Sequence, residues 1–351
     1  MSISKTNEQA FEELIEKSLV GTTVEERHGN VYVDSQQPDD SHFYWGKPKD
    51  MDSKLAIDLR RLWSFLKTTQ VDALEELKGL SLDDIPKQIA KQIDAFGVVD
   101  VLRNGVKINN IHLTLFYPKP SAADSDLSKV QYGKNQFSVT RQQTFSLWNP
   151  GLEIDMVVFV NGIPLFTLEL KNPWTHQTAH YDGERQYKSK ERSPKDPLLK
   201  FGHCLAHFTV DKNEAYFTTK LALDKTYFMP FNQGVPDGQG GGNPSQPDMG
   251  YRTKYLWENV LRKDSIADII MNYALFDYGE AKTQKKVPHI MKNAKKLIFP
   301  RFHQLDAVNR LIADVAANGV GKKYLIEHSA GSGKSNSLTW LAYKMVKVCP
   351  D

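Results

Sequence analysis

The sequence predicts an α/β fold in which a domain with a mixed β-sheet is followed by the beginning of a second α/β domain. Apolar, strand-like segments occupy the middle of the chain, and segments with helical periodicity flank them. With 351 residues, of which 40% are hydrophobic, the chain can form two or three domains with buried cores. Near its end, a glycine-rich motif stands between an apolar run and a helical one, as in phosphate loops.

Three segments in the first hundred residues show helical periodicity. Residues 6–20 open with a capping-box pattern, and apolar residues follow at helical intervals. Residues 58–69 and 83–97 repeat this periodicity, and Gly97 is a typical helix stop. Residues 20–50 are polar and interrupted by Gly and Pro, so we expect irregular structure there.

Strand-like segments dominate the middle of the chain. Residues 98–120 resemble two strands joined at Asn104-Gly105, a dipeptide typical of hairpins. Further strands are expected within 135–148, 151–173 and 201–221.

Three other segments connect or follow these strands. Residues 174–191 are expected to be helical in their second half. Residues 232–250 are dominated by Gly and Pro and are predicted to form a mobile loop or linker. Residues 255–277 return to helical periodicity.

The composition limits the classes of function. A net charge of +3 means that any binding of nucleic acid must come from local basic patches. The two cysteines, Cys204 and Cys349, are far apart in sequence and indicate reduced thiols rather than a disulfide scaffold. The polar N-terminus lacks a signal-peptide pattern, and no run reaches about 18 apolar residues. We therefore expect a soluble cytoplasmic protein.

A basic segment separates the two predicted domains. Residues 281–305 carry lysines and one arginine but no acidic residue. We predict a nuclease-sized domain over 1–280, a basic linker over 281–298 and the start of the second domain over 299–351. The basic run fits a DNA track that neutralises phosphates as well as it fits a solvated linker.

The hairpin within 151–173 carries charges where a core strand would carry Val or Ile. Asp155 lies on its first strand, and Glu169 and Lys171 lie on its second. Because strand side chains alternate, Glu169 and Lys171 project from one face. The spacing alone is equally compatible with a solvated strand face.

The turn decides whether Asp155 joins that face. A strict two-residue turn at Asn161-Gly162 would point Glu169 away from Asp155. A three-residue loop over 161–163 would place Asp155 directly opposite Glu169. We predict this second register, in which all three charged groups converge.

Such a convergence has a chemical use. Two carboxylates on one face repel each other unless a cation lies between them, and oxygen ligands with room for water suit Mg²⁺. At a phosphodiester, a bound metal can polarise the phosphoryl oxygen, activate a water and stabilise the leaving oxygen. Lys171 could orient or deprotonate that water and stabilise the developing charge.

The stretch "EIDMVVFVNGIPLFTLELKNP" resembles the nuclease core of type I restriction enzyme R (motor) subunits, which belong to the PD-(D/E)xK superfamily. The likeness includes the upstream "NQFSVTRQ" and extends to "YLWENVLRKDS". It implies a mixed-sheet PD-(D/E)xK endonuclease-like domain, metal binding by Asp155 and Glu169, and a catalytic role for Lys171. Ile154 stands where the superfamily name places a Pro.

The resemblance also implies a Gln, with a Tyr, on the helix after this motif. Gln186, next to Tyr187, is the residue that we expect in this catalytic role. The family's Q-x-x-x-Y spacing is met instead by Gln177 and Tyr181, which lie closer to the motif.

Residues 324–346 fit a phosphate loop, because an apolar run precedes "AGSGKS" and a helical segment follows it. Backbone amides of the glycine-rich turn would face phosphate oxygens, the lysine would reach the β- and γ-phosphates, and the serine after it would hold Mg²⁺. His328 replaces the first Gly of the general pattern. The predicted nucleotide-binding residues are Gly331, Ser332, Gly333, Lys334 and Ser335.

This motif resembles that of superfamily 2 helicases and translocases, and Gln304 upstream resembles their adenine-reading Q motif. The resemblance implies the beginning of a RecA-like, ATP-driven motor lobe. The sequence stops before an acidic box and a second lobe, both of which ATP hydrolysis needs. We therefore expect the front portion of a longer polypeptide, without ATPase activity of its own.

Two functions follow as hypotheses. In the first, the chain is the Mg²⁺-dependent endonuclease portion of a type I restriction R subunit, which acts on double-stranded DNA with methylation and specificity subunits. In the second, it is a catalytically silent DNA-binding module attached to a translocase. Substitution of Asp155, Glu169 and Lys171 distinguishes the two.

Overall fold

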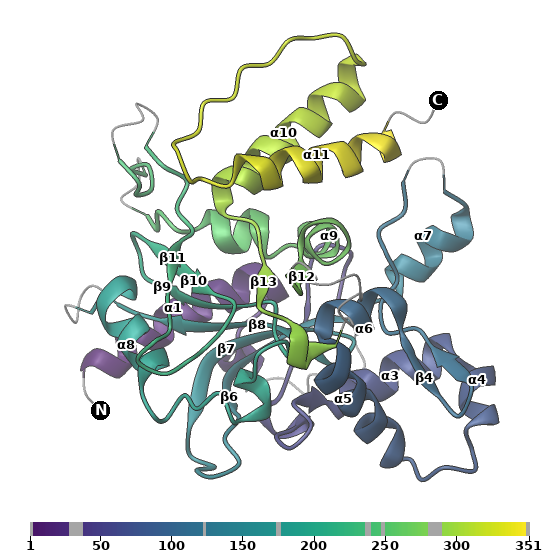
Figure 1. The fold of residues 1–351 in the computed structure, drawn as a ribbon. Coiled ribbons are helices and arrows are strands. Elements are labelled where there is room, and N and C mark those ends of the chain that lie inside the picture. Colours follow the sequence, from purple (N-terminus) through teal and green to yellow (C-terminus); the bar gives the residue numbers. More distant parts are fainter. Residues whose placement is uncertain are drawn as a thin grey trace.

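A seven-stranded mixed sheet forms the centre of the molecule, with the strand order β1-β6-β7-β8-β9-β10-β11 (Figure 1). The structure is a computed structural model and describes residues 3–27, 38–121, 124–172, 177–235, 240–246, 250–279 and 290–348. The strands are β1 (Tyr44–Trp45), β6 (Phe137–Thr144), β7 (Glu153–Val160), β8 (Ile163–Leu170), β9 (Ala206–Val210), β10 (Ala215–Thr218) and β11 (Met229–Pro230). β1 is parallel to β6 and β9 is parallel to β8, whereas the other neighbours are antiparallel. The predicted mixed sheet is therefore confirmed.

Helices and three short hairpins surround this sheet (Figure 1). The helices are α1 (Ile3–Val20), α2 (Val24–Arg27), α3 (Leu59–Thr69), α4 (Val71–Glu76), α5 (Asp84–Phe96), α6 (Val98–Asn104), α7 (Asp126–Gly133), α8 (Glu184–Lys188), α9 (Lys263–Asp268), α10 (Phe302–Asn318) and α11 (Lys334–Val348). The hairpins pair β2 (Met51–Asp52) with β3 (Ile57–Asp58), β4 (Val106–Ile108) with β5 (Ile111–Leu113), and β12 (Leu275–Asp277) with β13 (Lys296–Ile298). Among the described helices, none combines the length and the apolar character needed to cross a membrane.

The central strands bury side chains on both faces. On one face, Met156 and Phe208 belong to a large core that also contains Phe11 of α1. On the other face, Val157 and Phe159 belong to a smaller core that also contains Tyr187 of α8. Burial on two faces explains why β7 and β8 are nearly continuous apolar runs in the sequence.

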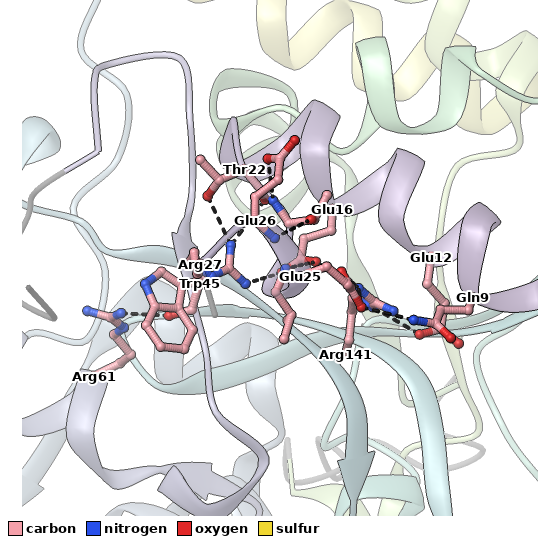
Figure 2. Close-up of polar contacts among 12 residues, drawn as sticks. Gln9, Glu12, Glu16, Thr22, Glu25, Glu26, Arg27, Trp45, Arg61 and Arg141 are labelled. Carbon is pink, nitrogen blue, oxygen red and sulfur yellow. Dashed lines mark hydrogen bonds and ion pairs between the residues drawn. The ribbon is translucent and has the colours of Figure 1, made fainter. Parts of the chain in front are cut away.

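Buried ion pairs hold α1 against the sheet. Arg141 of β6 donates hydrogen bonds to Glu12 (3.0 Å) and Glu16 (3.1 Å) of α1, and to Glu25 of α2 (3.0 Å to Oε2) (Figure 2). Arg27 contacts the same Glu16, so the two arginines share one buried carboxylate. No sequence motif marks this network, because its members are up to 129 residues apart.

Residues 98–104 form a helix, which corrects the predicted strand. α6 buries side chains at helical rather than alternating intervals: Val98, Val99, Val101 and Leu102. Gly105 ends this helix with a φ of 69°, and its N–H donates to the carbonyl of Val101. The hairpin of this region lies further on, where Asn109 and Asn110 adopt positive φ between β4 and β5.

Part of the segment 232–250 is packed rather than mobile, which corrects a second prediction. Asn243 is buried and donates to the carbonyl of Asn213 at 2.8 Å. Its side-chain oxygen accepts the N–H of Gln233 at 2.8 Å. One buried amide therefore fixes the described part of this loop. Residues 236–239 and 247–249 lie outside the described residues.

The described end of the predicted basic linker is also packed. β13 pairs with β12, Leu297 is buried, and Thr219 donates to the carbonyl of Leu297 at 3.1 Å. Residues 280–289, with the first lysines of the basic run, lie outside the described residues. The domain division at this segment stays a prediction.

The last part of the chain consists of α10 and α11, which lie side by side (Figure 1). The helix expected after the glycine-rich motif is present and begins at Lys334. The strand expected before the motif is not: residues 320–329 adopt no strand, and Leu325 is almost fully exposed. A strand needs another strand to pair with, and none of the described strands pairs with this segment.

Candidate functional site

The β7–β8 hairpin turns through two residues, which corrects the predicted three-residue loop. Asn161 and Gly162 adopt φ values of 51° and 83°, and Val160 pairs directly with Ile163. Positive φ at both central residues is the requirement of a type I′ turn, and Asn-Gly is its preferred sequence.

A β-bulge in β8 then shifts the register. Phe159 pairs with Pro164, but Val158 pairs with Phe166, so Leu165 is an extra residue on β8. Pro164 has no N–H to donate to a neighbouring strand, and prolines within sheets are tolerated at bulges for this reason. The bulge supplies the one-residue shift that the prediction had assigned to the loop.

This shift brings Asp155 and Glu169 together. Met156 pairs with Leu168 beyond the bulge, so the next pair along the two strands is Asp155 with Glu169. The N–H of Leu170 donates to Oδ2 of Asp155 at 2.6 Å, which fixes that carboxylate at the end of the strand pair. The predicted juxtaposition is thus present, although its local cause is different.

Glu169 is completely buried, and only one of its two carboxylate oxygens accepts a hydrogen bond within the described residues. Nε of Arg192 donates to its Oε1 at 2.7 Å, whereas its Oε2 has no hydrogen-bond partner within the described residues. Burial, together with the nearby charge of Asp155, raises the pKa of the Glu169 carboxyl to about 8. The cations of Arg192 and Lys171 oppose this shift without cancelling it.

Lys171 is held on the same face as Glu169. It is two residues further along the chain, it is buried except for 8% of its surface, and its N–H donates to the carbonyl of Val210 at 2.8 Å. A helical turn over Ala179–Gly183 closes over it, because a Cβ on Gly183 would lie 3.5 Å from Cγ of Lys171 and would collide with Thr209. The aliphatic stem of Lys171 therefore packs against this turn.

Two residues near this site were not identified from the sequence. Arg192 lies 23 positions after Glu169, and no motif marks it. Tyr187 was noted only as the neighbour of Gln186, yet its buried hydroxyl lies 2.7 Å from Oγ1 of Thr167 on β8. Gln186 is half-buried, and its side chain makes no hydrogen bond within the described part of the chain, so its role stays a prediction.

The donor set fits a hard divalent cation with few protein ligands. Glu169 offers a buried, unpartnered oxygen, and Asp155 lies opposite it. No cluster of three or more Asp, Glu, His or Cys side chains suited to a metal occurs within the described residues. Mg²⁺ accepts such an arrangement, because it retains several waters and often binds one or two carboxylates.

The glycine-rich motif before α11 is folded as a closed loop. Nζ of Lys334 donates to the carbonyls of His328 and Ser329, both at 3.0 Å. Gly331 and Gly333 adopt positive φ. Ser332 lies between these glycines, and Ser335 follows Lys334. Oγ of Ser332 is buried without a partner in the described chain.

Gln304 of α10 is tied to this loop. Its Nε2 donates to the carbonyls of Ser332 (3.1 Å) and Gly333 (2.9 Å), and its Oε1 accepts the N–H of Arg301. A Cβ on Gly333 would lie 2.4 Å from that Nε2. The amide that was expected to read adenine therefore holds the loop in this structure.

Comparisons with known proteins identify relatives of this chain. Residues 9–226 match the family described as the N terminus of type I restriction enzyme R proteins. A protein of Methanocaldococcus jannaschii that is named as the MjaVIIIP endonuclease subunit of a type I restriction enzyme is 21% identical over 287 residues. That alignment covers 77% of this chain and 24% of the relative, so the chain spans about a quarter of the relative's length.

Proposed function

This chain belongs to the type I restriction enzyme R protein N-terminal family, and from that premise we propose that it is the Mg²⁺-dependent DNA endonuclease portion of such an enzyme. The observation that carries the proposal is the pairing of Asp155 with Glu169 on a buried hairpin, with Lys171 two residues further on. The endonuclease name of the archaeal relative supports it.

The chain's own residues would divide the work as follows. Asp155 and Glu169 hold the cation, and the N–H of Leu170 keeps Asp155 in position. The bound Mg²⁺ would activate a water and stabilise the charge that develops on the phosphate. Lys171 would help to orient that water from the same strand face, and its ammonium would oppose the charge that develops on the attacked phosphate.

The wider activity is part of the same proposal. Cleavage of double-stranded DNA would follow ATP-driven translocation, in a cytoplasmic complex with methylation and specificity subunits. Within this chain, the loop before α11 is the nucleotide site, because Lys334 lies at the N-terminus of a helix behind two glycines with positive φ. The proposed ATP contacts are Gly331, Ser332, Gly333, Lys334, Ser335 and, after release from the loop, Gln304.

Three single substitutions test the nuclease proposal. Asp155→Ala, Glu169→Ala and Lys171→Ala should each abolish DNA cleavage by the assembled complex, while leaving ATP-driven translocation intact. Glu191→Ala is the matched control, because Glu191 is an exposed acid beside the buried Arg192. If cleavage survives all three substitutions, the alternative of a catalytically silent DNA-binding module is correct.

A second test concerns ATP. We expect these 351 residues by themselves to show no ATPase rate above that of their Lys334→Ala variant, since ATP hydrolysis needs an acidic box and a second lobe in addition to the phosphate loop. A measurable difference between the two rates would contradict this expectation.

A further inference from the structure

We propose that this site holds a single divalent ion between Asp155 and Glu169, and that the guanidinium of Arg192 occupies the carboxylate oxygen that a second ion would need. The inference rests on the proposed nuclease function and concerns how many ions that nuclease uses. Nuclease sites that work with two metals need carboxylate oxygens for both.

Each of the two carboxylates has one oxygen committed to the protein. Oδ2 of Asp155 accepts the N–H of Leu170 at 2.6 Å, and Oε1 of Glu169 accepts Nε of Arg192 at 2.7 Å. The remaining oxygen of Glu169 is buried and has no partner in the described residues. One oxygen on each carboxylate is therefore available, which suffices for one shared ion.

Arg192 is built into its position and is not a mobile surface side chain. It is 4% exposed, and its Nη2 donates to the carbonyl of Glu153 at 2.7 Å. Its guanidinium also stacks over Phe145, 5.2 Å from the ring centroid. Displacing it from Glu169 would leave a buried, uncompensated cation, which is strongly unfavourable.

Two neighbouring acids, Glu184 and Asp211, are occupied as well. Glu184 of α8 binds His180 at 2.7 Å and Lys188 at 2.6 Å. Asp211 accepts backbone N–H groups from Ala179 and from the turn that follows Asp211. Neither carboxylate has an oxygen to spare for a second cation.

The acids of α1 cannot supply the missing ligand, because they lie on the other face. Arg141 pairs with Met156, the residue after Asp155, so the side chains of Arg141 and Asp155 point to opposite faces of the sheet. Glu12 and Glu16 are bound to Arg141 there (Figure 2).

The test is a count of bound Mn²⁺, followed through the electron paramagnetic resonance signal of the free ion. Mn²⁺ is titrated into the 351-residue chain without nucleotide, and into Asp155→Asn and the control Glu191→Gln. We expect one ion per chain, at least tenfold weaker binding in Asp155→Asn, and unchanged binding in Glu191→Gln. Two ions that both depend on Asp155 would overturn the single-ion inference and leave the nuclease proposal standing. No ion dependent on Asp155 would overturn both.

A second variant tests Arg192 directly. Arg192→Met frees Oε1 of Glu169, so this variant should bind two Mn²⁺ ions or bind one at least tenfold more tightly, whereas Arg192→Lys should still bind one. Circular dichroism establishes which variants are folded. A folded Arg192→Met that binds one ion with unchanged affinity contradicts the role given to Arg192. If this variant does not fold, the count in the unmodified chain decides the inference.

Discussion

Lys344 of α11 donates a hydrogen bond to Asp268 of α9 and so ties the helix after the glycine-rich loop to α9. The same ammonium donates to Asn309 of α10 at 2.8 Å and lies 4.7 Å from the ring centroid of Tyr273. Trp340, one turn earlier, donates its indole N–H to the carbonyl of Tyr273. Because Lys344 is buried and has several partners, it holds α11 firmly against α9 and α10.

Lys344→Met should weaken the attachment of α11 to α9 and α10. The substitution keeps the apolar stem but removes the charge that Asp268 requires, so we expect amides of α11 to exchange with solvent about tenfold faster or more, while those of β7 and β8 stay protected. Hydrogen exchange followed by mass spectrometry measures both. Lys347→Met is the control, because Lys347 is exposed and binds only Asn272. Equal protection of α11 in both variants would show that the ion cluster does not hold it.

Arg141 should be essential for stability. Its removal takes a buried cation from Glu12 and leaves Glu16 with Arg27 alone, so Arg141→Met is expected to lower the free energy of unfolding by about 3–5 kcal/mol. Urea denaturation followed by circular dichroism gives this value. Lys17→Met removes an exposed ion pair with Glu26 and should change the unfolding free energy little. A small effect of Arg141→Met would mean that α1 is held by its apolar face alone.

The hairpin shows how far the sequence determines the site. Its charged residues and its turn dipeptide are evident in the sequence, and the convergence of Asp155 with Glu169 could be predicted from them. The bulge at Leu165 was not, because two-versus-one pairing depends on how a strand packs against its neighbours. A correct juxtaposition was therefore predicted from an incorrect loop.

Other features of the fold could not be predicted from the sequence, for related reasons. Residues 98–104 carry β-branched residues that favour a strand, but packing of their helical face overrode that propensity. Arg192 and the Arg141 network depend on contacts between distant segments, for which a single sequence carries no spacing signal. The packed Asn243 is a similar case, since one of its partners, Asn213, lies in a different loop 30 residues away.

His207 should make the protein less stable in mild acid. Burial lowers the pKa of this imidazole from 6.5 to about 3, so the unfolded chain binds a proton more readily than the folded one between these values. Stability is therefore full above the unfolded pKa and falls as the pH drops, by about 2 kcal/mol between pH 7 and pH 5 for this one group. Urea denaturation at both pH values should show this loss, and His207→Gln should lack it. His112→Gln, at an exposed site, should retain it. An equal pH dependence in both variants would contradict this assignment.

Gly162→Ala should destabilise the hairpin that carries the site. Gly162 has a φ of 83°, and a Cβ there would lie 2.4 Å from the carbonyl oxygen of Asp58 and 2.7 Å from the backbone nitrogen of Leu62. Neither backbone atom can move without displacing the start of α3, so strain and collision together should cost about 2 kcal/mol or more. Thermal denaturation measures the loss. Gly133→Ala is the matched control, because a Cβ at that position on α7 meets no atom within 4 Å. We expect Gly133→Ala to leave the melting temperature unchanged or slightly raised, and an equal change in both variants would refute the steric explanation.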